Sequence, residues 1–278
     1  MALDPVSELF DDAVNQLKGI VFPVKPRLLS NISSVYPDTE AMSELLMADP
    51  ALCLSVLKAN SFQKSSELSQ TSIQEAIDEL GGERLMIMIK AVMFIMAKHG
   101  DFHQWDFEDF WETSKQVADI TTELARQLNI PLVDEAQCVG ILHNAGMPFL
   151  WQKHPNYFDQ IKELDGKSLI AREDELFKCD HATIGFYIAK GLNLDHSVCE
   201  VIRLHHFSED ILCKSQVADD KTQTLLALLK IAENIAEEQF QLVHSSDQTE
   251  WDRMKGCVFE ILGISELDYE DLAGMFQN

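Results

Sequence analysis

Apolar residues recur every three or four positions along most of this chain, which is the period of an amphipathic helix. Glycine, proline and asparagine separate the periodic segments, and no run alternates with the period of a strand. The sequence therefore predicts an all-α protein. The helices predicted in the second half span 106–128, 134–151, 180–190, 195–206, 221–240 and 248–262, with a short final helix from residue 266.

The first hundred residues follow the same pattern. Asp49 and Pro50 are typical of a helix N-terminus, because aspartate is a favoured N-cap and proline fits the first turn. The most apolar stretch, 85–97, is shorter than the ~20 residues that cross a bilayer. A seam at 100–107 then separates two closely packed helical bundles, predicted over 1–100 and 101–278.

Two aspartates place the histidines of the second half on their helices. Asp180 and Asp195 are both N-cap residues by type and position. Asp180 therefore puts His181 in the first turn of its helix. Asp195 puts the doublet His205-His206 in the last turn of the next helix.

The charge balance narrows the range of partners. The chain has 278 residues, with 46 acidic against 22 basic side chains, and a formal net charge of -24. Such a surface repels phosphate backbones and anionic lipids, so we expect no nucleic-acid partner and no membrane binding. The N-terminus carries acids where a secretory signal carries bases, which favours a cytoplasmic location.

The cysteines are widely scattered and form no C-x-x-C pair. In a cytoplasmic chain of this length we expect reduced and mostly buried thiols. They are Cys53, Cys138, Cys179, Cys199, Cys213 and Cys257.

Two motifs in the first half carry a family resemblance. They read DPALCLSVLKANS over 49–61 and SIQEAIDELGGERL over 72–85. With the later motifs they resemble the HDOD domain, the HD-related output domain of bacterial signalling proteins, over roughly 22–240. The later motifs are FWETS (110–114), ILHNAG (141–146), DHATIG (180–185) and VIRLHH (201–206).

The resemblance implies an all-α fold whose C-terminal bundle is like that of HD-superfamily metal phosphohydrolases. Active members of that superfamily hold metal with a histidine in the FWETS helix, a His-Asp pair, later histidines and a final aspartate. This chain has Thr113 at the first position, His143-Asn144 at the pair and Glu233 at the last. Asn144 lacks the charge that a divalent cation needs.

The later histidines are the ones that match the cyclic-dinucleotide phosphodiesterase branch of the superfamily. With two expected ligands replaced by weak ones, we predict no native metal, no cofactor and no catalytic residues. The histidines are then expected to bond to one another and to neighbouring acids. The residues of this weakened site are His143, Asn144, His181, His205, His206 and Glu233.

The leading hypothesis is a non-catalytic signalling or regulatory module that binds partner signalling proteins or a small ligand. The alternative is a metal-dependent phosphohydrolase acting on a nucleotide or cyclic dinucleotide, with Fe, Mn or Zn held by the altered ligands. A third possibility is a sensor that binds a small nucleotide without cleaving it. A sensor needs cations near the motifs, and Lys153, Arg172 and Arg203 are the candidates.

Overall fold

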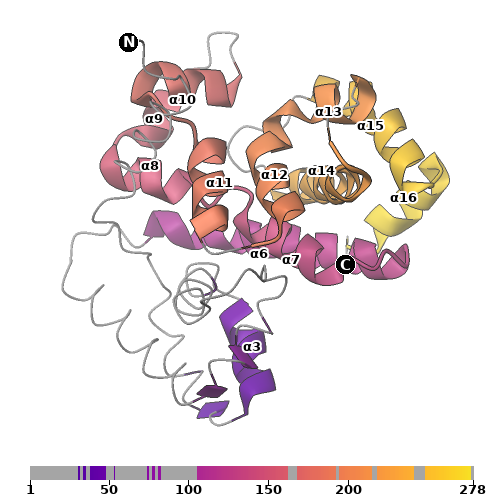
Figure 1. Ribbon diagram of the computed structural model, residues 1–278, viewed down its shortest axis with the longest axis horizontal. Coiled ribbons are helices and arrows are strands. Elements are labelled where there is room, and N and C mark those ends of the chain that lie inside the picture. Colours follow the sequence, from indigo (N-terminus) through magenta and orange to yellow (C-terminus); the bar gives the residue numbers. More distant parts are fainter. Residues whose placement is uncertain are drawn as a thin grey trace.

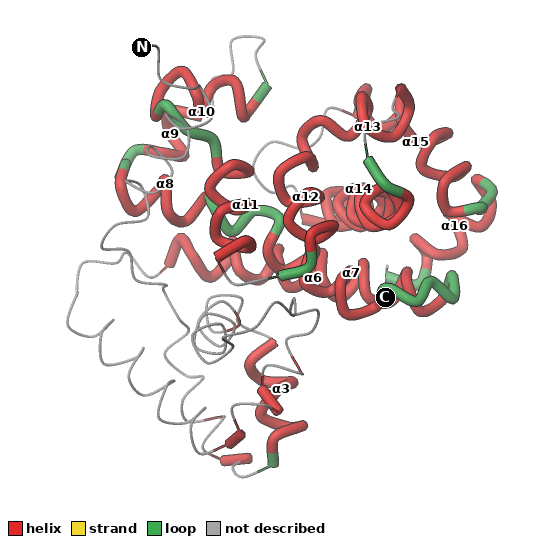
Figure 2. The backbone as a smooth tube through the Cα atoms, viewed as in Figure 1, coloured by secondary structure: helices red, strands yellow, loops and turns green. Residues whose placement is uncertain are grey.

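The computed structural model describes residues 105–161, 168–191, 194–214, 218–240 and 248–276, together with 38–47 and isolated residues between 31 and 82. All regular elements in these ranges are helical, without a β-strand, as Figure 2 shows. The predicted all-α class is therefore confirmed.

Much of the first hundred residues lies outside the described ranges. The helix predicted from Asp49, apart from Cys53, and the apolar stretch 85–97 are among the parts left out. The predicted division into two bundles at residue 100 therefore stays a prediction. None of the described helices combines the length and the apolar character needed to cross a bilayer.

The described α-helices are labelled in Figure 1. In order they are α3 (Thr39–Met47), α6 (Trp105–Gln127), α7 (Val133–Leu142), α8 (Met147–Lys153), α9 (Tyr157–Ile161), α10 (Leu169–Phe177), α11 (His181–Gly191), α12 (His196–Leu204), the 3₁₀ helix η1 (His205–Phe207), α13 (Ser208–Lys214), α14 (Asp220–Phe240), α15 (Gln248–Leu262) and α16 (Glu266–Gly274).

Helix α14 is the central element of the C-terminal half. It contacts α6, α7, α12, α13 and α15, and Figure 1 shows it nearly end-on among these helices. A helix that is apolar on every side is buried in a core, and residues 225–236 of α14 are of this kind. Lys230 lies within this run and is itself buried. The apolar residues buried here are Leu225, Leu226, Ala227, Leu228, Leu229, Ile231, Ala232, Ile235 and Ala236.

The prediction of a single helix over 134–151 is wrong, because the structure has two helices in this range. Helix α7 ends at Leu142, residues 143–146 form turns, and α8 begins at Met147 with Pro148 in its first turn. Proline is tolerated in the first turn of a helix but not in its interior. The break places His143 at the C-terminal end of α7.

In the second half of the chain, the three short helices α9, α10 and α13 were not predicted. Each spans nine residues or fewer, so its apolar face offers too few repeats for the periodicity to stand out. The two predicted N-caps are present: Asp180 accepts from the backbone N–H of Thr183, and Asp195 from that of Ser197. The histidine doublet lies in η1, just past the α-helix in whose last turn it was predicted.

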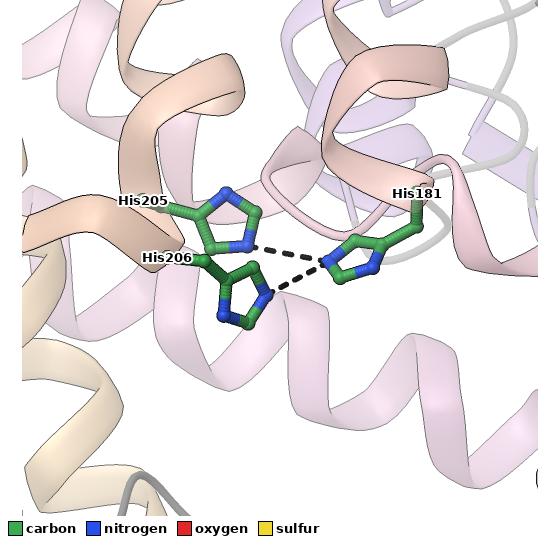
Figure 3. Close-up of side chains that lie close together, drawn as sticks. All are labelled: His181, His205 and His206. Atoms are coloured by element: carbon green, nitrogen blue, oxygen red, sulfur yellow. Dashed lines mark hydrogen bonds between the residues drawn. The ribbon is translucent and has the colours of Figure 1, made fainter. Parts of the chain in front are cut away.

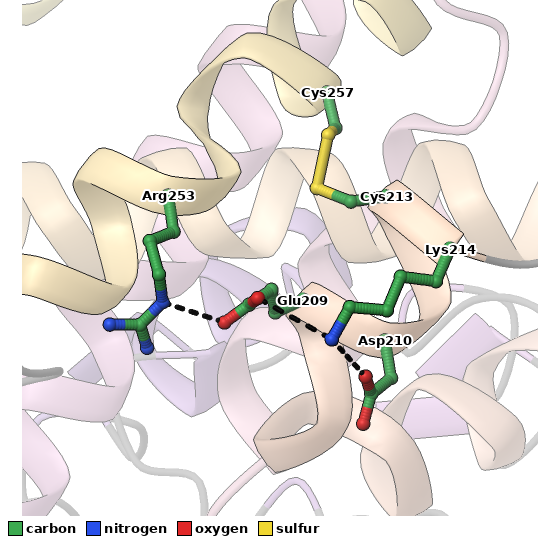
Figure 4. The surroundings of a disulfide bond; sticks show 6 residues. All are labelled: Glu209, Asp210, Cys213, Lys214, Arg253 and Cys257. Atoms are coloured by element: carbon green, nitrogen blue, oxygen red, sulfur yellow. Dashed lines mark hydrogen bonds and ion pairs between the residues drawn. A yellow bond between two sulfur atoms is a disulfide. The ribbon is translucent and has the colours of Figure 1, made fainter.

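A disulfide joins Cys213 of α13 to Cys257 of α15, so the expectation that all six cysteines are thiols is wrong for this pair. The two residues are 44 positions apart in sequence, and their Cα atoms lie 5.4 Å apart. Packing of α13 against α15 brings them together, which no local spacing reveals. The surrounding ion pairs, drawn in Figure 4, also link the two helices through Glu209 and Arg253, 2.8 Å apart. The other four cysteines are buried.

Two glycines allow close packing beside the residues of the histidine cluster: one between α7 and α6, the other between the turn after α7 and the start of α11. A Cβ at Gly140 of α7 would lie 2.4 Å from the Cα of Ala118 on α6. A Cβ at Gly146 would lie 2.0 Å from the backbone oxygen of His181. Real Cβ atoms do not come this close to backbone, so the turn after His143 can rest on the start of α11 only because residue 146 is glycine.

Gly146→Ala is expected to lower the free energy of unfolding by about 2–3 kcal/mol or more, because overpacking against backbone cannot be relieved by a rotamer change. Gly256→Ala is the matched control. Gly256 lies inside α15, and a Cβ there would have nothing within 4 Å. The control is expected to be neutral or to add up to about 1 kcal/mol. Urea unfolding followed by circular dichroism measures both, and equal effects would contradict the tight contact.

Candidate functional site

Three imidazoles from α11 and η1 meet in the interior of the C-terminal half. His181 Nε2 lies 3.0 Å from His206 Nε2 and 3.4 Å from His205 Nε2 (Figure 3). One nitrogen of each ring falls within 4.8 Å of the others. His181 and His205 are fully buried, and His206 is partly buried. The structure thus unites three histidines that are up to 25 positions apart in sequence.

His143 and Glu233 extend this cluster. The His143 ring lies edge-on to that of His205, with centroids 5.5 Å apart. Its Nε2 is 3.6 Å from Glu233 Oε1. The structure therefore brings together five of the six predicted site residues through described contacts: the four histidines and the glutamate. The predicted hydrogen bonding among histidines and acids is present.

Backbone carbonyls determine which nitrogen carries the hydrogen in two of the rings. His143 Nδ1 lies 2.9 Å from the carbonyl oxygen of Gly140, and His205 Nδ1 lies 2.7 Å from that of Ile202. A carbonyl oxygen only accepts, so each Nδ1 carries the hydrogen. In the neutral rings each Nε2 then keeps a lone pair; Nε2 of His205 faces Nε2 of His181, and Nε2 of His143 faces Glu233.

A buried carboxylate holds His181. Glu173 of α10 is fully buried, and its Oε2 accepts from both the backbone N–H and the Nδ1–H of His181, at 2.9 and 2.7 Å. Its Oε1 accepts from the hydroxyl of Tyr157. Glu173 therefore fixes the orientation of the His181 ring in the way that an outer carboxylate orients a ligating histidine. This role could not be predicted, because Glu173 stands in an acidic run typical of a solvated helix face.

Burial and charge push the pKa values of these histidines apart. Burial lowers the pKa of His143, and Glu233 offsets only part of this effect. Burial and the neighbouring imidazoles lower the pKa of His205 and His206 well below the usual value. Burial acts the same way on His181, but attraction to Glu173 and other acids outweighs it and the pKa of His181 is raised. His181 is therefore the ring of this cluster that binds a proton most readily.

A buried lysine completes the site and was missed by the sequence analysis. Lys230 Nζ lies 2.6 Å from Glu233 Oε2, one helical turn away on α14. The Glu233 carboxylate therefore stands between the Lys230 ammonium and the His143 ring. The sequence does contain a signal that Lys230 is buried, because it stands in the apolar run LLALLKIA. In the structure its neighbours Leu229 and Ile231 are both buried.

The two replaced ligand positions lie on neighbouring elements. Asn144 is in the turn after α7, and its buried Oδ1 has no hydrogen-bond partner. Thr113 is half-buried on α6, a helix that packs against both α7 and α14. Asn144 thus offers an unused but neutral oxygen where the hydrolases have an acid.

The three cations predicted for a nucleotide sensor have other surroundings. Arg203 binds Glu200 of its own helix and lies 5.9 Å from the centre of the Phe186 ring. Arg172 pairs with Glu175, and Lys153 is exposed in the last turn of α8. Lys230 is the cation that the structure places against the site.

The donor set does not fit a hydrolytic metal centre of the HD type. Such a centre needs carboxylates to neutralise its ions and to orient the attacking water. Here Asn144 is neutral, and Glu233 is already bonded to an ammonium. The Nε2 atoms alone form an imidazole set of the kind that Zn or Fe accepts. The expectation of no native metal stays a prediction.

An all-helical fold with a histidine cluster and a His-Asn pair defines the class of HD-like helical domains. Within this class, the family model of the HDOD domain matches residues 23–208, well over half of the chain. The chain belongs to the HDOD domain family. The match ends before α14, so Lys230 and Glu233 lie beyond it.

Solved structures share this fold. The MmoQ response regulator from Methylococcus capsulatus str. Bath is 20% identical, with a TM-score of 0.71 over 92% of this chain and 98% of that one. A virulence factor from Campylobacter jejuni subsp. jejuni is 15% identical, with a TM-score of 0.65 over 99% of each chain. An HDOD domain protein of unknown function from Geobacter sulfurreducens is 22% identical, with a TM-score of 0.50 over 97% and 94%. No curated protein matches the sequence.

Proposed function

We propose that this chain is a non-catalytic signalling module of the bacterial cytoplasm that acts by binding a partner protein or a small ligand. The observation that carries the proposal is the shared carboxylate of Glu233, which bonds to Lys230 and faces His143. A carboxylate in this position neutralises a lysine of its own chain instead of a metal ion. The role of the histidines is then structural: with Glu173 they tie α7, α10, α11 and η1 together.

A metal-dependent phosphohydrolase is the second candidate, and the three converging imidazoles favour it. In this reading His181, His205 and His206 hold Fe, Mn or Zn, which supplies an activated water. Asn144 argues against it, since it removes a charge from the place where charge is most needed.

Metal content and phosphodiesterase activity distinguish the non-catalytic module from the phosphohydrolase. Protein made without a histidine tag is expected to carry well under one equivalent of Fe, Mn or Zn by elemental analysis. It is expected not to hydrolyse a cyclic dinucleotide or bis-(p-nitrophenyl) phosphate in added Mn²⁺. His206→Ala is the control, because activity that survives this change comes from a contaminant. Stoichiometric metal, with turnover that His206→Ala abolishes, would establish the hydrolase instead.

A further inference from the structure

We propose that Lys230 is a built-in cation that takes the place of a metal charge beside the histidine cluster, and that removing it creates a site for a divalent transition-metal ion. This inference rests on the proposed function, in which the native chain works without a metal. It assigns the metal specificity of the site to one residue that is not among the expected ligand positions of the family resemblance.

Lys230 is a charged residue at a buried position, which is rare in proteins. Its side chain is buried in the most apolar part of α14, and burying an ammonium is costly unless charge and hydrogen bonds compensate it. The compensation comes from Glu233, at 2.6 Å. The lysine and the glutamate together bring no net charge to the site.

The histidines, by contrast, are arranged as ligands that await a positive charge. Nδ1 of His143 and of His205 donates to a backbone carbonyl, and Nδ1 of His181 to Glu173. Metal-binding histidines show this same arrangement, in which an outer acceptor fixes the ring and frees the other nitrogen. Ring nitrogens of His181, His205 and His206 already lie within 4.8 Å of one another, and the His143 ring lies beside that of His205. The imidazoles therefore already converge, and the charge of Lys230 is what opposes a metal ion.

The field of Lys230 reaches the cluster. The lysine Nζ lies 2.6 Å from one oxygen of Glu233, whose other oxygen is 3.6 Å from Nε2 of His143. A positive charge at this place repels a divalent cation, and in a buried site water screens it little. Without the lysine, the three converging imidazoles remain, and the Glu233 carboxylate beside His143 loses its ion-pair partner; imidazoles and carboxylates are ligands that suit Fe, Co or Zn.

The test compares Co²⁺ binding by untagged wild-type protein and Lys230→Met, using calorimetry and the visible absorption of bound Co²⁺. Lys230→Met is expected to bind Co²⁺ at least about tenfold more tightly than wild type. Its thermal unfolding temperature is expected to rise when Co²⁺ is added, because a ligand of the folded state stabilises it. Lys230→Gln, whose amide can still donate to Glu233, is expected to show the same gain with less loss of stability.

Two controls show where the ion binds. Lys221→Met removes another ion-paired lysine of α14, one that binds Glu135 and Asp195, and is expected to leave Co²⁺ affinity at the wild-type value. Adding His206→Ala to Lys230→Met is expected to abolish the gain.

Equal Co²⁺ affinity in wild type and both Lys230 variants overturns the inference. So does a pair of Lys230 variants that fail to fold even with Co²⁺ present, because the ion then cannot replace the lysine. Tight binding by the wild type contradicts the proposed function instead, and the inference still stands if the variants bind tenfold more tightly.

Discussion

Replacing Glu173 by alanine is expected to lower the free energy of unfolding by about 3–5 kcal/mol, the usual cost of breaking a buried charged pair. The carboxylate is fully buried and accepts three hydrogen bonds, from the Tyr157 hydroxyl and from two groups of His181. Alanine leaves all three donors buried without an acceptor, and each such group destabilises the fold.

Glu175→Ala is the control on the same helix. Glu175 is half-exposed and pairs with Arg172, an interaction worth about 1 kcal/mol or less. Urea denaturation followed by circular dichroism compares the two variants. If Glu173→Ala costs no more than Glu175→Ala, then the carboxylate does not hold His181 in the way described.

Reduction of the disulfide between Cys213 and Cys257 is expected to lower the free energy of unfolding by up to about 4 kcal/mol, since the bond closes a loop of some 44 residues in the unfolded chain. A dithiol reductant supplies the two electrons and two protons that convert the disulfide to two thiols. The effect is measured as the shift in thermal unfolding between oxidised and reduced protein.

The double variant Cys213→Ser/Cys257→Ser provides the control. It is expected to match reduced wild type and to be insensitive to the reductant. A reductant effect that persists in this variant would place the sensitivity elsewhere. Because cytosolic disulfides are rare, the stability of the reduced protein is the value that applies in a reducing compartment.

The long helices could be predicted from the sequence because each repeats its apolar face over several turns. The predicted range 248–262 coincides with α15, and 221–240 differs from α14 by one residue. The break after His143 was missed although Pro148 indicates it, because proline is tolerated in the first turn of a helix and not in its interior. The contact of Gly146, in the turn, with the backbone of His181 joins segments far apart in sequence and could not be predicted.

The four histidines and Glu233 of the candidate site could be predicted from the sequence, because the motifs of the family resemblance contain them. Glu173 and Lys230 are not among the expected ligand positions, and their importance comes from burial, which sequence position alone does not reveal. Charged residues at buried positions are rare, so a lone lysine within an apolar helix is a useful signal for other sequences.

The region that matches the family model ends at residue 208, within the first turn of α13. A fragment truncated at that boundary would keep all four histidines and Glu173, yet it would lack both Lys230 and Glu233 of α14. It would also expose the faces of α6, α7 and α12 that α14 covers. Metal affinity or solubility measured on such a fragment would describe a different site from that of the whole chain.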